Sequence, residues 1–145
     1  MILYLDTSAL AKLFIDEPGS EMVEAVVGAA LAVATHLLAY AEMHATLARA
    51  VRMGRVEATD LDRRLREFEE RWASLDVVEA TDALVRRAGA LAVRHGLRGY
   101  DSVHLAAALV VHETLGPGVD LRFGASDARL NEAARLGGLT LLELA

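Results

Sequence analysis

The chain opens with a short run of large apolar residues, Ile2 to Leu5, that stops at Asp6. A run of this length, bounded by the polar Thr7 and Ser8, is typical of a strand buried in a parallel sheet. Ligands of open α/β sheets bind beyond the carboxyl ends of the strands. Asp6 is therefore predicted to lie close to the core and within reach of a ligand. An ionised carboxylate is costly there unless a positive group stands beside it.

Short apolar runs and helical patterns alternate along the rest of the chain. Further strands are predicted at residues 31–34, 76–79, 121–123 and 139–142, and helices at about 8–15, 20–29, 35–53, 61–72, 81–96, 100–115 and 127–136. Two helix starts depend on caps: Thr35 for the third helix, and Thr59 with Asp62 as a capping box for the fourth. Strands that alternate with helices predict an α/β domain with a mostly parallel central sheet.

The composition limits the class of protein. At 145 residues the chain fits one domain, residues 1–145, and its 54% hydrophobic content predicts a sizeable core. It has no cysteine, which excludes disulfides, thiolate metal sites and cysteine nucleophiles. No apolar segment reaches the roughly 20 residues that span a bilayer, and no basic segment precedes the first strand, so no signal peptide is expected. We therefore expect a cytoplasmic protein without membrane contact.

The net charge of −6 is the wrong sign for a typical nucleic-acid-binding protein. If four acids are metal ligands, the remaining charge is only −2, and bound cations would raise it further. The basic residues are almost all arginine, with Lys12 the single lysine. Arginine binds phosphate through two parallel hydrogen bonds, so the overall charge does not decide the partner.

Three further acids occupy places comparable to that of Asp6. Glu42 lies inside an apolar helix, Asp101 opens another helix, and Asp127 follows the run from Leu121 to Ser126. Asp101 and Asp127 could equally be helix-start acids, favoured by the helix dipole, and Asp6 could cap the first helix. Glu42 has no capping role. Four carboxylates without matching bases indicate a hard divalent cation, Mg²⁺ or Mn²⁺.

Four segments in the same order resemble PIN-domain proteins of the VapC toxin type. These segments are Leu5 to Phe14 with Glu17 to Glu21, then Ala41-Glu42, then Leu97 to Ala108, and finally Phe123 to Asp127 with Leu130 and Ala133-Ala134. The resemblance covers essentially the whole chain. One position departs from the pattern, since the family often has Ser or Thr two residues before the last acid and this chain has Ala125. A role for the adjacent Ser126 at a metal site is left open.

The resemblance implies a three-layer α/β/α domain and a Mg²⁺- or Mn²⁺-dependent endoribonuclease. Asp6, Glu42, Asp101 and Asp127 would be both the metal ligands and the catalytic residues. A metal-activated water would hydrolyse RNA phosphodiester bonds, in keeping with the general chemistry of such ions. The family also implies that the protein is the toxin of a toxin–antitoxin pair, with a cognate antitoxin protein that blocks the site, usually within homodimeric assemblies. The RNA target is not implied.

Two alternatives to this function stay open. A catalytically inactive PIN-like interaction module would keep the fold without turnover. A haloacid-dehalogenase-like phosphatase also starts with a strand and an aspartate, but it needs a second Asp where this chain has Ser8. It also needs a lysine beyond mid-chain, whereas the single lysine of this chain is Lys12. An apolar stripe on the fourth helix, formed by Leu61, Leu65, Phe68 and Trp72, could either mediate self-association or close the domain's own core.

Some polar residues are compatible with more than one role. His104 lies three residues after Asp101 and is interpreted as a packed polar residue of the core, with a contact to the metal site or RNA as the alternative. The arginines 49, 52 and 55 lie on or just past the helix of Glu42, where they could reach a phosphate backbone. Asp120 is a rival for the fourth ligand, but it precedes its strand and is predicted to lie at the opposite edge of the sheet from Asp6.

Overall fold

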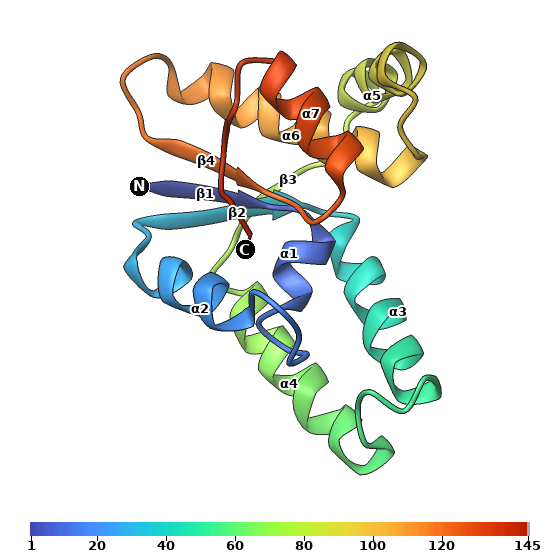
Figure 1. Ribbon diagram of the computed structural model, residues 1–145. Coiled ribbons are helices and arrows are strands. Elements are labelled where there is room, and N and C mark those ends of the chain that lie inside the picture. Colours follow the sequence, from blue (N-terminus) through green and yellow to red (C-terminus); the bar gives the residue numbers. More distant parts are fainter. Residues whose placement is uncertain (145) are drawn as a thin grey trace.

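The computed structural model describes residues 1–144, in which strands and helices alternate (Figure 1). The elements are β1 (Ile2–Leu5), α1 (Thr7–Ala11), α2 (Ser20–Ala29), β2 (Ala32–His36), α3 (Ala39–Arg52), the 3-10 turn η1 (Ala58–Asp60), α4 (Leu61–Trp72), β3 (Asp76–Val78), α5 (Asp82–His95), α6 (Gly99–Leu115), β4 (Leu121–Gly124), α7 (Ala128–Leu136) and β5 (Thr140–Leu141). This order agrees with the alternation predicted from the sequence.

The central sheet has β1 in its middle. All five strands run parallel, in the order β3-β2-β1-β4-β5. Ile2 pairs with both Ala32 and Leu121, so β1 is hydrogen-bonded along each of its edges. The α/β class is confirmed, and the sheet, predicted to be mostly parallel, is parallel throughout the described residues. Because parallel strands end at the same edge, the segments that follow β1, β2 and β4 come together there.

Helices cover both faces of the sheet. Figure 1 shows α5, α6 and α7 on one side and α1 to α4 on the other. Since successive side chains of a strand point to opposite faces, Tyr4 packs into the core beneath α6, whereas Leu3 and Leu5 pack against α1 and α3. The Tyr4 ring stacks on Phe123 of β4, with 5.8 Å between centroids. The three-layer arrangement expected from the family resemblance is confirmed.

Helix α6 is the central helix of one layer. Its residues 102–109 are all buried, which agrees with a pattern that is apolar nearly all round. The small residues Ala106, Ala107 and Ala108 are completely buried and allow a close approach to neighbouring elements. No helix in residues 1–144, α6 included, is long and apolar enough to cross a membrane.

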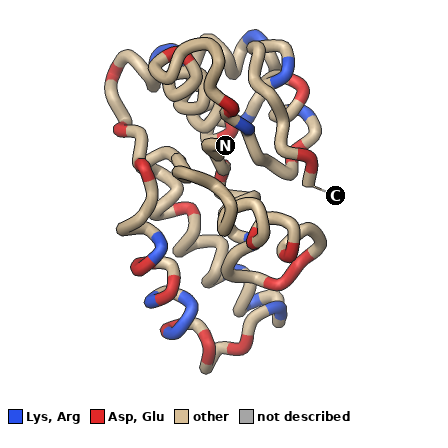
Figure 2. Tube along the Cα trace, turned by 90° about the vertical axis from the view of Figure 1, so that its left-hand side faces the viewer, with Lys and Arg blue, Asp and Glu red and all other residues tan. Residues whose placement is uncertain are grey.

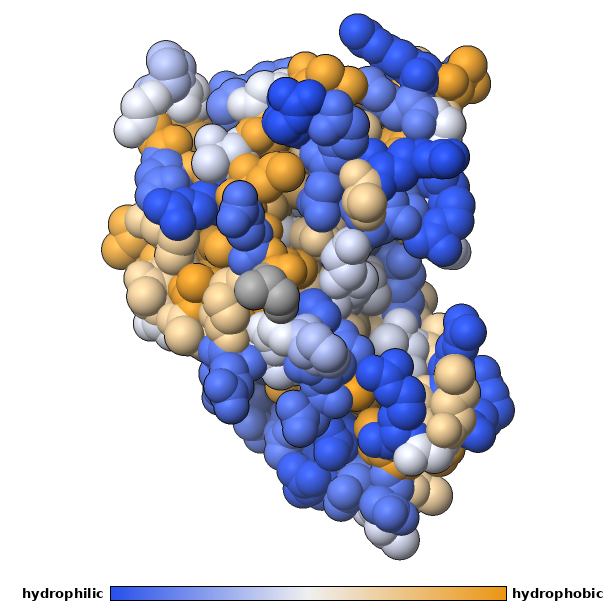
Figure 3. All heavy atoms as spheres, viewed as in Figure 1, coloured by the Kyte–Doolittle hydropathy of each residue, from blue (hydrophilic) through white to orange (hydrophobic). Residues whose placement is uncertain are grey.

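The apolar stripe on α4 packs into the second layer. Phe68 is fully buried, and Leu61, Leu65 and Trp72 pack against the same core cluster. The outer face carries alternating charges, including the i,i+4 pair Arg63–Glu67 (Figure 2). In the view of Figure 3, hydrophilic side chains dominate the lower half of the molecule, around α4. The stripe thus closes the domain's own core, and it no longer argues for self-association.

Two of the predicted helix caps are wrong. Thr35 does not cap α3, because it lies inside β2, and its hydroxyl donates to the Leu5 carbonyl at 2.8 Å. Strand pairing extends β2 to His36, and α3 begins only at Ala39. Thr59 lies within η1, and the residue that precedes α4 makes no side-chain cap bond. Local polar residues mark a possible helix start, but pairing with neighbouring strands overrode that preference here.

Gly124, at the carboxyl end of β4, offers a test of how tightly the layers meet beside Asp6. A Cβ at this position would lie 2.8 Å from a Leu5 methyl carbon, with Leu142 and Ala9 also in contact. We predict that Gly124→Ala lowers the free energy of unfolding by about 1–3 kcal/mol through overpacking. The matched control is Gly89→Ala in α5, where a Cβ meets nothing within 4 Å. That change should raise stability by about 0.5–1 kcal/mol. Urea unfolding measures both, and equal effects would contradict the packing.

Candidate active site

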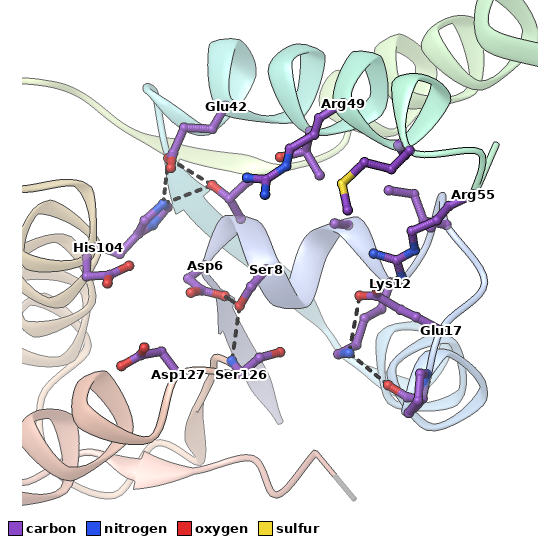
Figure 4. A pocket seen from close by; sticks show the side chains of 18 of the residues that line it. Asp6, Ser8, Lys12, Glu17, Glu42, Arg49, Arg55, His104, Ser126 and Asp127 are labelled. Atoms are coloured by element: carbon purple, nitrogen blue, oxygen red, sulfur yellow. Dashed lines mark hydrogen bonds and ion pairs between the residues drawn. The ribbon is translucent and has the colours of Figure 1, made fainter. Parts of the chain in front are cut away.

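A cavity of about 760 Å³ opens at the carboxyl edge of the sheet, between α1, α3 and the start of α6. All four acids singled out from the sequence line it, although they come from four separate segments: Asp6, Glu42, Asp101 and Asp127. Figure 4 shows Asp6 and Asp127 near one another, with Glu42 beside His104 at the same end. The structure thus brings the predicted residues to one place.

Asp6 caps α1 and also lines the cavity. Its Oδ1 accepts hydrogen bonds from the Ala9 backbone N–H at 2.9 Å and from the Ser8 hydroxyl at 2.7 Å, which caps α1. The residue is 4% exposed. Burial raises the pKa of Asp6 above its ordinary value, and nearby His104 together with these hydrogen bonds offsets only part of the effect. A positive ion in the cavity would relieve this cost.

Glu42 is held by a hydrogen-bond chain that begins in the core. Its Oε1 accepts from the Thr7 hydroxyl at 2.8 Å and lies 3.0 Å from Nε2 of His104. The Nδ1 of His104 lies 2.8 Å from the Tyr4 hydroxyl. Because an ionised carboxylate can only accept, Nε2 of His104 donates its proton to Glu42. Burial raises the pKa of Glu42, but the bonds from His104 and Thr7 outweigh it and lower the pKa overall.

The sequence did not reveal this chain in full. His104 is buried, as expected of a packed polar residue, yet its ring orients a candidate ligand instead of filling space alone. Asp6 is the cap of α1, as one interpretation of the sequence allowed, and the Thr7 hydroxyl donates to Glu42 instead. Tyr4 sits within an apolar strand, and burial raises its pKa well above the ordinary value, so its hydroxyl keeps its proton. Nothing in the sequence pattern marks Tyr4 as polar support for the site.

Arg98 is a site residue that the sequence analysis missed. Its Nε lies 3.0 Å from Oδ2 of Asp101, and its Nη2 lies 3.9 Å from Oδ2 of Asp127. The side chain is 79% exposed, so it can leave these partners at little cost. The only signal was its place directly before α6, three residues ahead of Asp101, where i,i+3 contacts occur.

The fourth acid is Asp127 in this geometry. Its Oδ1 caps α7 by accepting from the Leu130 backbone N–H at 2.9 Å, and the residue lines the cavity. Asp120 lies at the amino end of β4, pairs with Arg122 and is absent from the cavity wall, as predicted. Ser126 lines the cavity, and its backbone N–H donates to the Ser8 hydroxyl at 3.0 Å.

Each of the four carboxylates uses one oxygen for protein contacts and leaves the other without a hydrogen bond inside residues 1–144. The occupied atoms are Oδ1 of Asp6, Oε1 of Glu42, Oδ2 of Asp101 and Oδ1 of Asp127. The second oxygen of Asp127 has only the 3.9 Å approach of Arg98. This pattern fixes the side chains while it keeps four hard donors for a cation.

The donor set fits a partly hydrated Mg²⁺ or Mn²⁺ ion better than an ion that is enclosed entirely by protein ligands. Within residues 1–144, no three acidic or histidine side chains form a group ready to hold an ion. Mg²⁺, however, keeps several waters and is usually held through one or two carboxylates. The oxygen-only donors, and the raised pKa of buried Asp6, are consistent with such a water-rich site.

His36 lies behind this site as a buried neutral imidazole. Its Nδ1 accepts from the Leu38 backbone N–H at 3.0 Å, and its ring centroid lies 6.4 Å from that of His104. Burial, followed by the charge of His104, lowers the pKa of His36 from 6.5 to about 4. Protonation of His36 is therefore unfavourable in the folded state.

The depressed pKa of His36 predicts acid sensitivity. The unfolded chain binds this proton below about pH 6.5 and the folded protein only near pH 4, so His36 costs stability progressively as the pH falls through that window. His36→Asn, whose Oδ1 can still accept from Leu38, should show a shallower loss of unfolding free energy between pH 7 and pH 5. Asp6, with its raised pKa, acts in the opposite sense in both proteins. The unfolding free energy of both proteins is measured by urea unfolding at pH 7 and at pH 5. An equal loss between these pH values in the wild-type protein and in the variant would refute the assignment.

Comparison with known proteins agrees with this geometry. Residues 3–136 match the PIN-domain family, and the chain therefore belongs to that family. It is 38% identical over 137 residues to Ribonuclease VapC45 of Mycobacterium tuberculosis (strain CDC 1551 / Oshkosh), which covers 94% of this chain and 92% of that protein. The resemblance to VapC proteins predicted from the sequence is confirmed.

Solved structures show the same fold. The VapBC2 structure from Rickettsia felis, bound to a promoter DNA fragment, superposes with a TM-score of 0.64 at 11% identity, over 98% of each chain. A toxin–antitoxin complex from Klebsiella pneumoniae gives a TM-score of 0.59 at 15% identity, over 86% of each chain. At these identities the likeness supports the three-layer architecture.

Proposed function

We propose that this protein is a divalent-metal-dependent endoribonuclease and the toxin of a toxin–antitoxin pair. The observation that carries the proposal is the set of four carboxylates around one cavity, each with one oxygen fixed and one oxygen available. Membership of the PIN family and the similarity to a protein named Ribonuclease VapC45 support it. The same family membership weighs against the phosphatase alternative.

The proposed ligands are Asp6, Glu42, Asp101 and Asp127, which would hold Mg²⁺ or Mn²⁺. When bound, such an ion supplies a polarised water and neutralises charge that develops on phosphate oxygens. The chain's own residues do the positioning. The Ala9 N–H and Ser8 hydroxyl hold Asp6, and the chain from Tyr4 through His104 holds Glu42. Arg98 balances Asp101 and, being exposed, can turn toward a substrate phosphate.

The proposal includes an antitoxin partner and a homodimer. The similar structures from Rickettsia felis and Klebsiella pneumoniae are named as a VapBC assembly and a toxin–antitoxin complex, which supports a protein partner for this chain. The homodimer is proposed from the family resemblance alone, because the α4 stripe packs in the domain's own core. RNA substrate and antitoxin would both be encountered in the cytoplasm, where the proposal places the protein.

Metal removal tests the activity directly. We predict that purified protein cuts RNA only with Mg²⁺ or Mn²⁺, that excess EDTA stops the reaction, and that added Mg²⁺ restores it. The reason is that every candidate metal ligand is a carboxylate, the type of donor that binds Mg²⁺. Sequencing of the RNA ends before and after chelation is the measurement. Undiminished cutting in EDTA would disprove metal dependence, and no cutting under any condition would favour the inactive interaction module.

The choice of the fourth ligand is tested by a matched pair of variants. Asp127→Asn should weaken Mg²⁺ binding and cleavage by at least about 10- to 100-fold, because its carboxylate faces the cavity. Asp120→Asn removes an equal charge next to the same strand, outside the cavity, and should leave both nearly unchanged. Calorimetric metal titration and cleavage rates give the two readouts. If Asp120→Asn proved the more damaging change, β4 would be wrongly oriented relative to the site.

A further inference from the structure

The cavity extends beyond the four carboxylates, and its other end is lined by three basic residues and one acid. Lys12 comes from the turn after α1, Glu17 from the loop before α2, Arg49 from α3 and Arg55 from the segment after α3. Figure 4 shows Lys12, Glu17 and Arg55 grouped at the end away from Asp127 and His104. One cavity therefore joins an acidic end to a basic end.

Glu17 forms ion pairs with two of these cations. Its Oε1 lies 3.2 Å from Nζ of Lys12, and its Oε2 lies 2.9 Å from Nη2 of Arg55. Lys12 is additionally fixed by a 2.7 Å bond to the Pro18 carbonyl, and its side chain is only 9% exposed. Arg55 is 49% exposed. Glu17 is thus anchored by Lys12, whereas Arg55 is free to exchange Glu17 for another anion.

Arg49 has no acidic partner within residues 1–144. It follows Glu42 by seven residues, or about two helical turns, and therefore shares its face of α3. Arg52, three residues further along the same helix, is absent from the cavity wall. The cavity thus receives one unpaired guanidinium from α3, directly between the carboxylates and the Glu17 pair, as Figure 4 shows for Arg49.

Among residues 1–144, no Phe, Tyr or Trp side chain lines this cavity. Single-stranded nucleic acids are held by cationic grooves that follow the backbone and by aromatic rings on which bases stack. The basic end of the cavity therefore offers charged groups that can hold the backbone of a nucleic acid. Guanidinium groups suit this task, because they bind phosphate oxygens through two parallel bonds.

We propose that the basic end of the cavity is a subsite for a backbone phosphate of a single strand. In it, Arg49 makes the first contact and Glu17 competes with the phosphate for Arg55. The subsite rests on the proposed function, in which a neighbouring phosphodiester lies at the carboxylates. The subsite would also explain how a chain of net charge −6 holds a polyanion beside four carboxylates, since local cations are needed for this.

Binding of labelled single strands to three variants tests the subsite. The probe is a fluorescent 12-nucleotide RNA, measured by anisotropy with Mg²⁺ in an Asp101→Asn background so that it is not consumed, and the same sequence as DNA is run beside it. Arg49→Gln should weaken binding about 10-fold and make the plot of log affinity against log salt shallower by about 0.7. Glu17→Gln, which still accepts from Lys12, should tighten binding about 2- to 5-fold. Arg52→Gln is the matched control and should change little.

The outcomes separate the subsite from the proposed activity. Equal losses in Arg49→Gln and Arg52→Gln would overturn the subsite, whatever the protein cleaves. If Glu17→Gln clearly lowers the melting temperature, the comparison of Arg49→Gln with Arg52→Gln tests the subsite by itself. The same Arg49 dependence with RNA and DNA supports a site for the phosphodiester itself, and dependence with RNA only supports one that also contacts the ribose hydroxyl. Binding through Arg49 by a wild-type protein that cuts no RNA would leave the subsite standing and remove the nuclease.

Discussion

The carboxylate of Asp6 is the contact on which the site depends. It stands where the central strand ends, and one of its oxygens closes the first turn of α1 through the Ala9 N–H. That bond fixes the direction in which α1 leaves the sheet and therefore the wall of the cavity. The second oxygen makes no hydrogen bond in the described residues, and burial raises the pKa of the group. The cost of holding this charge in the fold would make a bound cation favourable there.

Much of the architecture could be predicted from the sequence, since it is written in local patterns. The apolar runs predicted the strands β1, β3 and β4, and the helices predicted at about 81–96 and 127–136 do begin at the Thr81 and Asp127 caps, because such features depend on neighbours only a few residues away. The rule about parallel strand ends accounts for Asp6 and Asp127, whereas Glu42 and Asp101 reach the same cavity from helices α3 and α6. Thr35 shows the limit of such reasoning, because its hydroxyl bonds to Leu5 across the sheet, not to its own helix.

The supporting contacts of the site could not be predicted in the same way. The Tyr4–His104 bond joins residues 100 positions apart, and the His104–Glu42 bond joins residues 62 apart. Each depends on how α3, α6 and the sheet pack, and none of these side chains has a spacing that marks the pairing. Net charge could not decide the partner for a related reason, because it averages over a surface on which acids and bases are separated within one cavity.

The hydrogen-bond chain from Tyr4 has a consequence for how this protein tolerates change. The Tyr4 ring belongs to the apolar core, where it stacks on Phe123, while its hydroxyl holds the imidazole that orients Glu42. A substitution that merely repacks this face of the sheet would tilt the ring and move the carboxylate. Interior packing and the geometry of the candidate site are therefore coupled. A hydrophobic substitution beneath α6 could therefore disturb the candidate site while the domain still folds.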